Sequence, residues 1–146
     1  MQLPSSPLVI HQRVGFSQTD AAGLIHFTTY FTFMEAAEAE LFRSLGLELL
    51  QTDKGRTCGY PRVDCQCRFR RPVGFDDLIQ IELRIGSIQD NRIHYDFLFL
   101  GPDGSRCATG SMVTAHACRE EEGSLSSVPL PAAVREKLEA WKNQAL

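Results

Sequence analysis

An acidic side chain precedes the most regular helical pattern of the chain and could take part in acyl chemistry. Asp20 comes shortly before Thr28 and Thr29, where a long apolar periodicity begins. The first turn of a helix presents unpaired backbone N–H groups and a partial positive charge. A nearby carboxylate could attack an acyl carbon or activate a water, while the helix end holds the oxyanion. A second interpretation stays open, because Asp20 and Gly23 also have the spacing of an ordinary turn.

The helix that would present this terminus is predicted by apolar residues at steps of three and four. They are Tyr30, Met34, Ala37, Leu41 and Leu45, and the stripe is widened by Phe31, Ala39 and Phe42. We expect a hydroxyl of Thr28 or Thr29 to cap the helix and Gly46 to end it. The polar candidates for its solvated face are Glu35, Glu38, Glu40 and Arg43.

The other predicted elements are mostly strands, which alternate apolar and polar residues. We expect a first strand over residues 8–16, and four strands after the helix over 63–70, 79–85, 93–99 and 106–118. Turns at 89–92 and 101–104 would join them. Residues 47–59 are interpreted as a loose connection, 119–131 as a loop and 132–144 as a short helix. This order predicts an α+β fold with a helix on one face of an antiparallel sheet.

Composition excludes several classes of protein. The 146 residues carry a net charge of −3, which provides no basic surface for nucleic acid. No apolar run is long enough to span a membrane, and residues 1–7 lack the pattern of a signal peptide. The five cysteines are odd in number, so we expect free thiols in a reducing compartment and a cytoplasmic location. Cys65 and Cys67 are interpreted as small apolar residues on a buried strand face, in preference to a metal or redox pair.

Residues 16–30 resemble the signature of the 4-hydroxybenzoyl-CoA thioesterase family. That signature runs from a strand through Asp-x-x-Gly, two aliphatic residues and an aromatic or His pair into a helix with a Tyr and an acidic residue. The corresponding residues here are Asp20, Gly23, Leu24-Ile25, His26-Phe27, Tyr30 and Met34-Glu35. Gly59-Tyr60-Pro61 and Arg70-Arg71-Pro72 also fit, and the similarity extends over most of residues 8–118.

The resemblance implies a hotdog fold, in which a long central helix is wrapped by a curved antiparallel sheet of about five strands. One domain would span residues 1–146, with its core at about 8–118 and a C-terminal loop and short helix at 119–146. The resemblance also implies a homodimer or homotetramer with the active site at the subunit interface.

The activity implied by the resemblance is hydrolysis of an acyl-CoA thioester, aromatic or of short to medium chain, without cofactor or metal. Asp20 would be the nucleophile or general base, the Phe27 backbone N–H would polarise the carbonyl, and Glu35 is held in reserve together with Glu38. Candidate substrate-binding residues are Gly23, His26, Gly59, Tyr60, Arg70 and Arg92, with Gly59 and Tyr60 coming from the other subunit.

One departure from the family concerns the CoA phosphates. Some relatives carry a basic cluster in the turn that here contains only Arg92. CoA would then be held by Arg92 with Arg68, Arg70 or Arg71, and an acyl-carrier-protein thioester is the alternative substrate. Two other functions stay open: a hotdog protein that binds an acyl thioester without cleaving it, and a hotdog dehydratase that uses His26 with Glu35.

Overall fold

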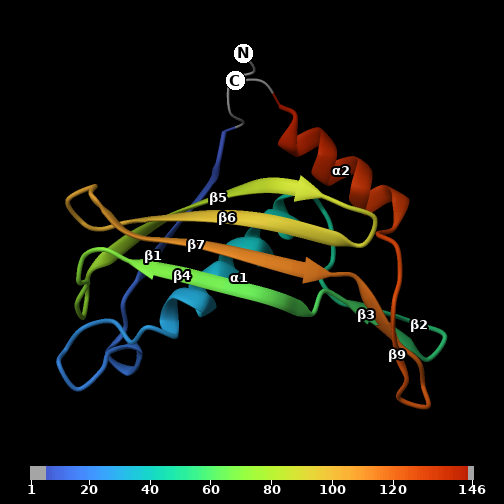
Figure 1. The fold of residues 1–146 in the computed structure, drawn as a ribbon, viewed down its shortest axis with the longest axis horizontal. Coiled ribbons are helices and arrows are strands. Elements are labelled where there is room, and N and C mark those ends of the chain that lie inside the picture. Colours follow the sequence, from blue (N-terminus) through green and yellow to red (C-terminus); the bar gives the residue numbers. More distant parts are fainter. Residues whose placement is uncertain (1–5, 145–146) are drawn as a thin grey trace.

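The computed structural model describes residues 6–144 of the chain (Figure 1). Its helices are α1 (Thr29–Ser44) and α2 (Ala132–Lys142), and a short 3-10 turn, η1, covers Phe16–Gln18. The longer strands are β1 (Leu8–Arg13), β4 (Arg62–Phe69), β5 (Leu78–Ile88), β6 (Arg92–Leu100) and β7 (Arg106–Ala115). The shorter strands are β2 (Gln51–Asp53), β3 (Arg56–Gly59), β8 (Ala117–Arg119) and β9 (Leu125–Ser127).

The main sheet is antiparallel and has five strands in the order β1-β5-β6-β7-β4. Alternate residues of its central strands are buried, among them Ile81 and Leu83 in β5 and Tyr95 and Phe99 in β6. Helix α1 runs across the buried face of this sheet, behind it in the view of Figure 1. The predicted helix and the α+β class are therefore confirmed, whereas the first strand ends at Arg13 instead of residue 16. The four strands after the helix were expected to form one antiparallel meander, and this is right only for β5, β6 and β7, because β4 pairs with β7 at the edge of the sheet.

The side chain of Met34 in helix α1 reaches the main sheet at Gly110 in β7. A Cβ atom added there would lie 2.2 Å from Met34 Cε and 3.2 Å from the Gln66 carbonyl oxygen. Met34 is completely buried. The absence of a side chain at residue 110 therefore leaves room for the Met34 side chain against β7.

A second antiparallel sheet, in the order β2-β3-β8-β9, was not predicted. Its strands fall in residues 47–59 and 119–131, which were interpreted as a connection and a loop, and in the end of the predicted strand 106–118. That predicted strand is interrupted at His116, where the chain passes from the main sheet into the second one. Strands of three or four residues are too short to show a period, and only their long-range pairing creates them.

The second sheet also corrects the expectation for the cysteines. Cys58 in β3 pairs with Cys118 in β8, and the two form a disulfide. Cys65, Cys67 and Cys107 are free. Cys65 is exposed, so the predicted buried face is wrong for that residue, because β4 is an edge strand with little cover from α1.

The C-terminal helix α2 packs against β5 through Val134 and Leu138, which confirms the predicted short helix. Over the described residues, neither helix has the length and apolar character needed to cross a membrane.

Candidate active site

The segment before α1 folds back on itself and is tied to the end of the main sheet. The backbone N–H of Asp20 donates to the Leu24 carbonyl at 2.7 Å, and that of Gly23 donates to the Asp20 carbonyl at 3.0 Å. Gly23 has a φ of 79°, which glycine adopts without strain. The Ile25 N–H then donates to the Val73 carbonyl at 2.7 Å. These bonds place Asp20 beside the start of the helix.

One carboxylate oxygen of Asp20 stabilises a turn, as the second interpretation of the sequence expected. Its Oδ1 accepts from the backbone N–H of Ala22 at 2.9 Å and of Leu24 at 3.2 Å. Among the described residues, Oδ2 has no hydrogen-bond donor, and the residue is exposed. The turn therefore orients the carboxylate while leaving the second oxygen open to a ligand.

A cavity of about 340 Å³ opens beside this carboxylate. Its walls are mostly apolar, with two guanidinium groups among the lining residues, which are Asp20, Leu24, Ile25, Phe27, Tyr30, Phe69, Arg70, Arg71, Pro72 and Val73. Of the predicted site residues, Asp20, Phe27 and Arg70 therefore share one cavity. An apolar pocket with a few polar groups suits a small organic ligand.

The backbone N–H of Phe27 is free to act as a donor. In residues 6–144, no acceptor receives a hydrogen bond from it, although the N–H groups of His26 and Thr29 on either side are used. Helix α1 starts at Thr29, so this N–H lies just before the positively polarised N-terminus of the helix. The predicted hydroxyl cap is not formed by Thr28.

His26 holds the residue just before the helix. Its Nδ1 lies 2.6 Å from Thr28 Oγ1 and accepts from the Thr28 N–H at 3.3 Å. Its ring stacks on Phe27 at 4.7 Å between centroids. His26 does not line the cavity, and its place in the structure is to hold Phe27 and the helix start.

Tyr30 lines the cavity, although the sequence interpretation placed it in the apolar stripe and the family signature without a role at the site. It is the first buried aromatic of the α1 stripe. Its ring packs against those of Phe69 and Phe99, with centroids 5.3 and 5.0 Å apart. Burial, followed by the Cys107 thiol beside it, raises the pKa of the Tyr30 hydroxyl, so this hydroxyl stays protonated. Its position at the first turn of the helix, close to Asp20 in the chain, was the signal for a role at the site.

The remaining predicted residues lie outside this cavity in the protomer. Gly59 is the last residue of β3 and Tyr60 follows it. The Tyr60 ring packs between those of Phe42 and His116, with centroids 5.1 and 5.2 Å apart. Burial, with a contribution from Glu38, raises the pKa of Tyr60 to about 12. Arg92 is exposed at the start of β6.

The two helical glutamates differ from each other. Glu35 is exposed, with its Oε2 4.0 Å from Arg62 Nη2. Glu38 is fully buried and accepts from Arg62 Nη2 at 2.7 Å, so a solvated face is wrong for this residue. Burial raises the pKa of Glu38 and the Arg62 charge opposes that rise. Within the described residues, Glu35 makes no contact with His26, so the pair considered for a dehydratase is not assembled in one protomer.

Comparisons with known proteins agree on one family. The model of the thioesterase-like superfamily matches residues 14–138. A 1,4-dihydroxy-2-naphthoyl-CoA hydrolase from Thermosynechococcus vestitus is 27% identical over 141 residues, covering 96% of this chain and 92% of the relative. A solved gentisyl-coenzyme A thioesterase is 28% identical with a TM-score of 0.76, covering 90% of this chain and 99% of that chain.

A mutant 4-hydroxybenzoyl-CoA thioesterase in complex with 4-hydroxybenzoyl-CoA has a TM-score of 0.78, with 92% of this chain and 99% of that chain covered. At 21% identity this likeness concerns the fold. The predicted resemblance is confirmed, and the antiparallel sheets with two helices agree with a hotdog thioesterase.

Proposed function

Because the chain belongs to the thioesterase-like superfamily, we propose that it hydrolyses acyl-CoA thioesters in the cavity beside Asp20. Thioester hydrolysis is the activity of its named relatives. The observation that carries the proposal is that Asp20 and Phe27 line one cavity and that the backbone N–H of Phe27 is unused. Those are the two groups that opening a thioester requires.

In the proposed reaction, Asp20 Oδ2 attacks the thioester carbonyl carbon or removes a proton from an attacking water. The Phe27 N–H and the positive end of α1 stabilise the oxyanion that forms. The carbon–sulfur bond then breaks, the CoA thiolate leaves and takes up a proton, and the acyl group is released as a carboxylic acid. In the nucleophilic variant, water hydrolyses the acyl anhydride on Asp20 before release.

The cavity walls favour a flat or compact acyl group. Phe27, Tyr30 and Phe69 provide aromatic surface, and both Arg70 and Arg71 lie on the same cavity, where they can pair with CoA phosphates. Aromatic acyl-CoA thioesters are therefore the first substrates to test, followed by short and medium acyl chains. The relatives that act on dihydroxynaphthoyl-CoA and gentisyl-CoA support the same choice.

We also propose a homodimer in which two protomers complete each site, with pairs of dimers forming a tetramer. Strand β4 ends the main sheet and pairs only with β7 among the described strands. Its Val63 and Phe69 are 47% and 53% exposed. An open edge with apolar side chains is a surface that a second copy can cover. Glu35, Gly59 and Tyr60 of the partner subunit are then the candidates for the far wall of the cavity. For each subunit we propose one domain spanning residues 1–146, with its central helix wrapped by the sheet as in a hotdog fold.

The test is the variant Asp20→Asn, assayed for free CoA thiol on benzoyl-CoA, dihydroxynaphthoyl-CoA and a series of acyl-CoAs. Asparagine keeps an oxygen for the Ala22 and Leu24 N–H groups, so the turn should persist. We expect kcat to fall by about 10²–10³ on the best substrate, by analogy with oxyanion-hole deletions.

The matched control is Glu136→Gln, the same chemical change on the exposed face of α2. It should keep wild-type turnover. Unchanged turnover of Asp20→Asn would refute the mechanism. Binding of acyl-CoA without thiol release by the wild type would instead indicate the non-hydrolysing alternative, and a dehydrated thioester in the mass spectrum would indicate the dehydratase.

A further inference from the structure

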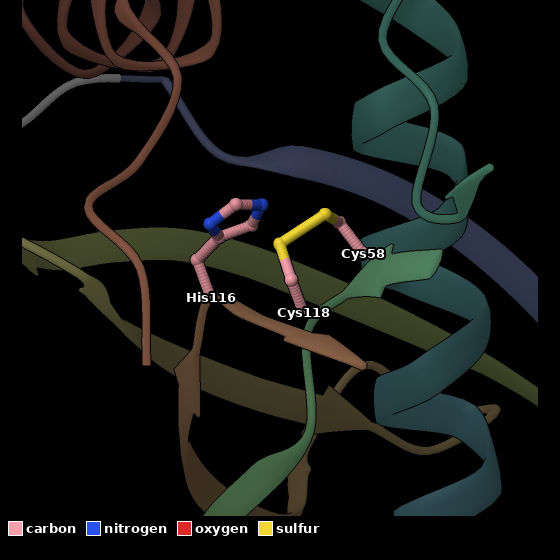
Figure 2. Close-up of side chains that lie close together, drawn as sticks. All are labelled: Cys58, His116 and Cys118. Atoms are coloured by element: carbon pink, nitrogen blue, oxygen red, sulfur yellow. A yellow bond between two sulfur atoms is a disulfide. The ribbon is translucent and has the colours of Figure 1, made fainter. Parts of the chain in front are cut away.

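Two cysteines and a histidine meet where the two sheets join, away from the cavity at Asp20. Cys58 in β3 and Cys118 in β8 are paired residues of neighbouring strands, and His116 lies two positions before Cys118. One ligand atom from each of the three residues lies within 4.8 Å of the others. In Figure 2 the imidazole ring turns one nitrogen toward the two sulfurs.

The orientation of His116 is set by a backbone carbonyl. Its Nδ1 lies 3.1 Å from the Val128 carbonyl oxygen, which can only accept, so Nδ1 carries the proton. In the neutral ring, Nε2 therefore has a free lone pair. Metal-binding histidines are commonly oriented in this way: one ring N–H donates to a carbonyl oxygen, and the other nitrogen is free to bind the metal.

Most of this cluster is buried. His116 and Cys118 are 4% and 1% exposed, and Cys58 is half-buried. A disulfide by itself needs no imidazole beside it. Two thiolates and one imidazole, on a scaffold held by β3–β8 pairing, are a ligand set suited to a tetrahedral zinc ion whose fourth position is taken by water.

We propose that Cys58, His116 and Cys118 bind a zinc ion when the two cysteines are reduced, and that the disulfide is the oxidised, metal-free form of the same site. A dithiol reductant supplies two electrons and two protons to the disulfide and becomes a disulfide itself. Each cysteine thiol then loses its proton on binding the metal. Oxidation by a small-molecule disulfide reverses the exchange and releases the ion.

The first test uses protein reduced with a phosphine, freed of metal by a chelator, and titrated with Co²⁺ as a spectroscopic substitute for Zn²⁺. We expect one ion per protomer, a thiolate-to-cobalt charge-transfer band, and displacement of Co²⁺ by Zn²⁺. Cys118→Ser and His116→Gln should weaken binding at least about tenfold. Cys65→Ser, which removes an exposed thiol elsewhere, should bind as the wild type does.

A second measurement uses only the wild type, so it tests the proposal even if the variants do not fold. Zn²⁺ should protect two of the five thiols of the reduced wild type from alkylation, and peptide mass spectrometry should identify them as Cys58 and Cys118. Equal alkylation with and without Zn²⁺ would overturn the proposal. A disulfide that is reduced only after the protein unfolds would overturn it as well. Neither result depends on thioesterase activity.

Discussion

At the scale of single residues, the carboxylates of Asp20 and Glu38 differ in their burial and in their hydrogen-bond partners. Asp20 uses one oxygen to stabilise its own turn and presents the other beside a cavity. Glu38 is fully buried beside Arg62, and its Oε2 and the nearby Tyr95 hydroxyl are buried without a well-formed hydrogen bond. In our proposal the first carboxylate takes part in catalysis, whereas the second is a polar group within the core that reduces stability when it is ionised.

Glu38 should make stability depend on pH. Burial is the main cause of its raised pKa, so the unfolded chain loses this proton more readily than the folded protein. The stabilising contribution of protonated Glu38 is then present below its unfolded pKa, about 4.3, and is lost as pH rises through the folded value. In Glu38→Gln, the free energy of unfolding should fall less with rising pH than in the wild type, as measured by urea titration across the acid range.

The corresponding control is Glu136→Gln, an exposed position on helix α2. Its pH dependence should match that of the wild type. Parallel curves for Glu38→Gln and the wild type would mean that the Arg62 charge cancels the effect of burial.

At the scale of elements, the site depends on how closely α1 packs on the sheet. The helix carries Tyr30 at its first turn and Met34 one turn later, and Met34 lies directly under Gly110. Movement of the helix away from β7 would therefore shift the Tyr30 wall and the free Phe27 N–H together. This close approach links a glycine in the middle of a strand to the geometry of the cavity.

Gly110→Ala should destabilise the protein by about 1–3 kcal/mol, because the new methyl group overlaps Met34 Cε and crowds the Gln66 carbonyl. Chemical denaturation gives the free energy of unfolding. The double variant Gly110→Ala with Met34→Ala should lose less than the sum of the two single variants, since the space left by Met34 accepts the methyl group. Strict additivity would show that the Met34 contact is not the cause.

At the scale of the whole molecule, the open edge of β4 contrasts with β5, β6 and β7, each of which pairs with a strand on both sides. Its outer side is unpaired in the described protomer, and its side chains are mostly exposed. The predicted site residues Glu35, Gly59 and Tyr60 do not line the cavity beside Asp20 in the same chain. Assembly of two copies would account for both observations.

Val63→Lys should weaken this assembly, because a charge on an edge strand opposes strand pairing. We expect light scattering to show a shift from dimer or tetramer toward monomer, with a parallel loss of thioesterase activity. Leu125→Lys in β9, an apolar residue on the second sheet that is 65% exposed, is the control and should leave both unchanged. A wild type that is monomeric and fully active would contradict the proposed shared site.

The amino-acid sequence by itself determined the long elements and the proximity of Asp20 to the helix start. An apolar period continued over several turns or strand residues decides locally which face is buried, as in α1 and β5. Only the tertiary structure decided the second sheet, the Cys58–Cys118 bond and the burial of Glu38. Each of these depends on segments that meet from distant parts of the chain, and such meetings leave no local period to detect.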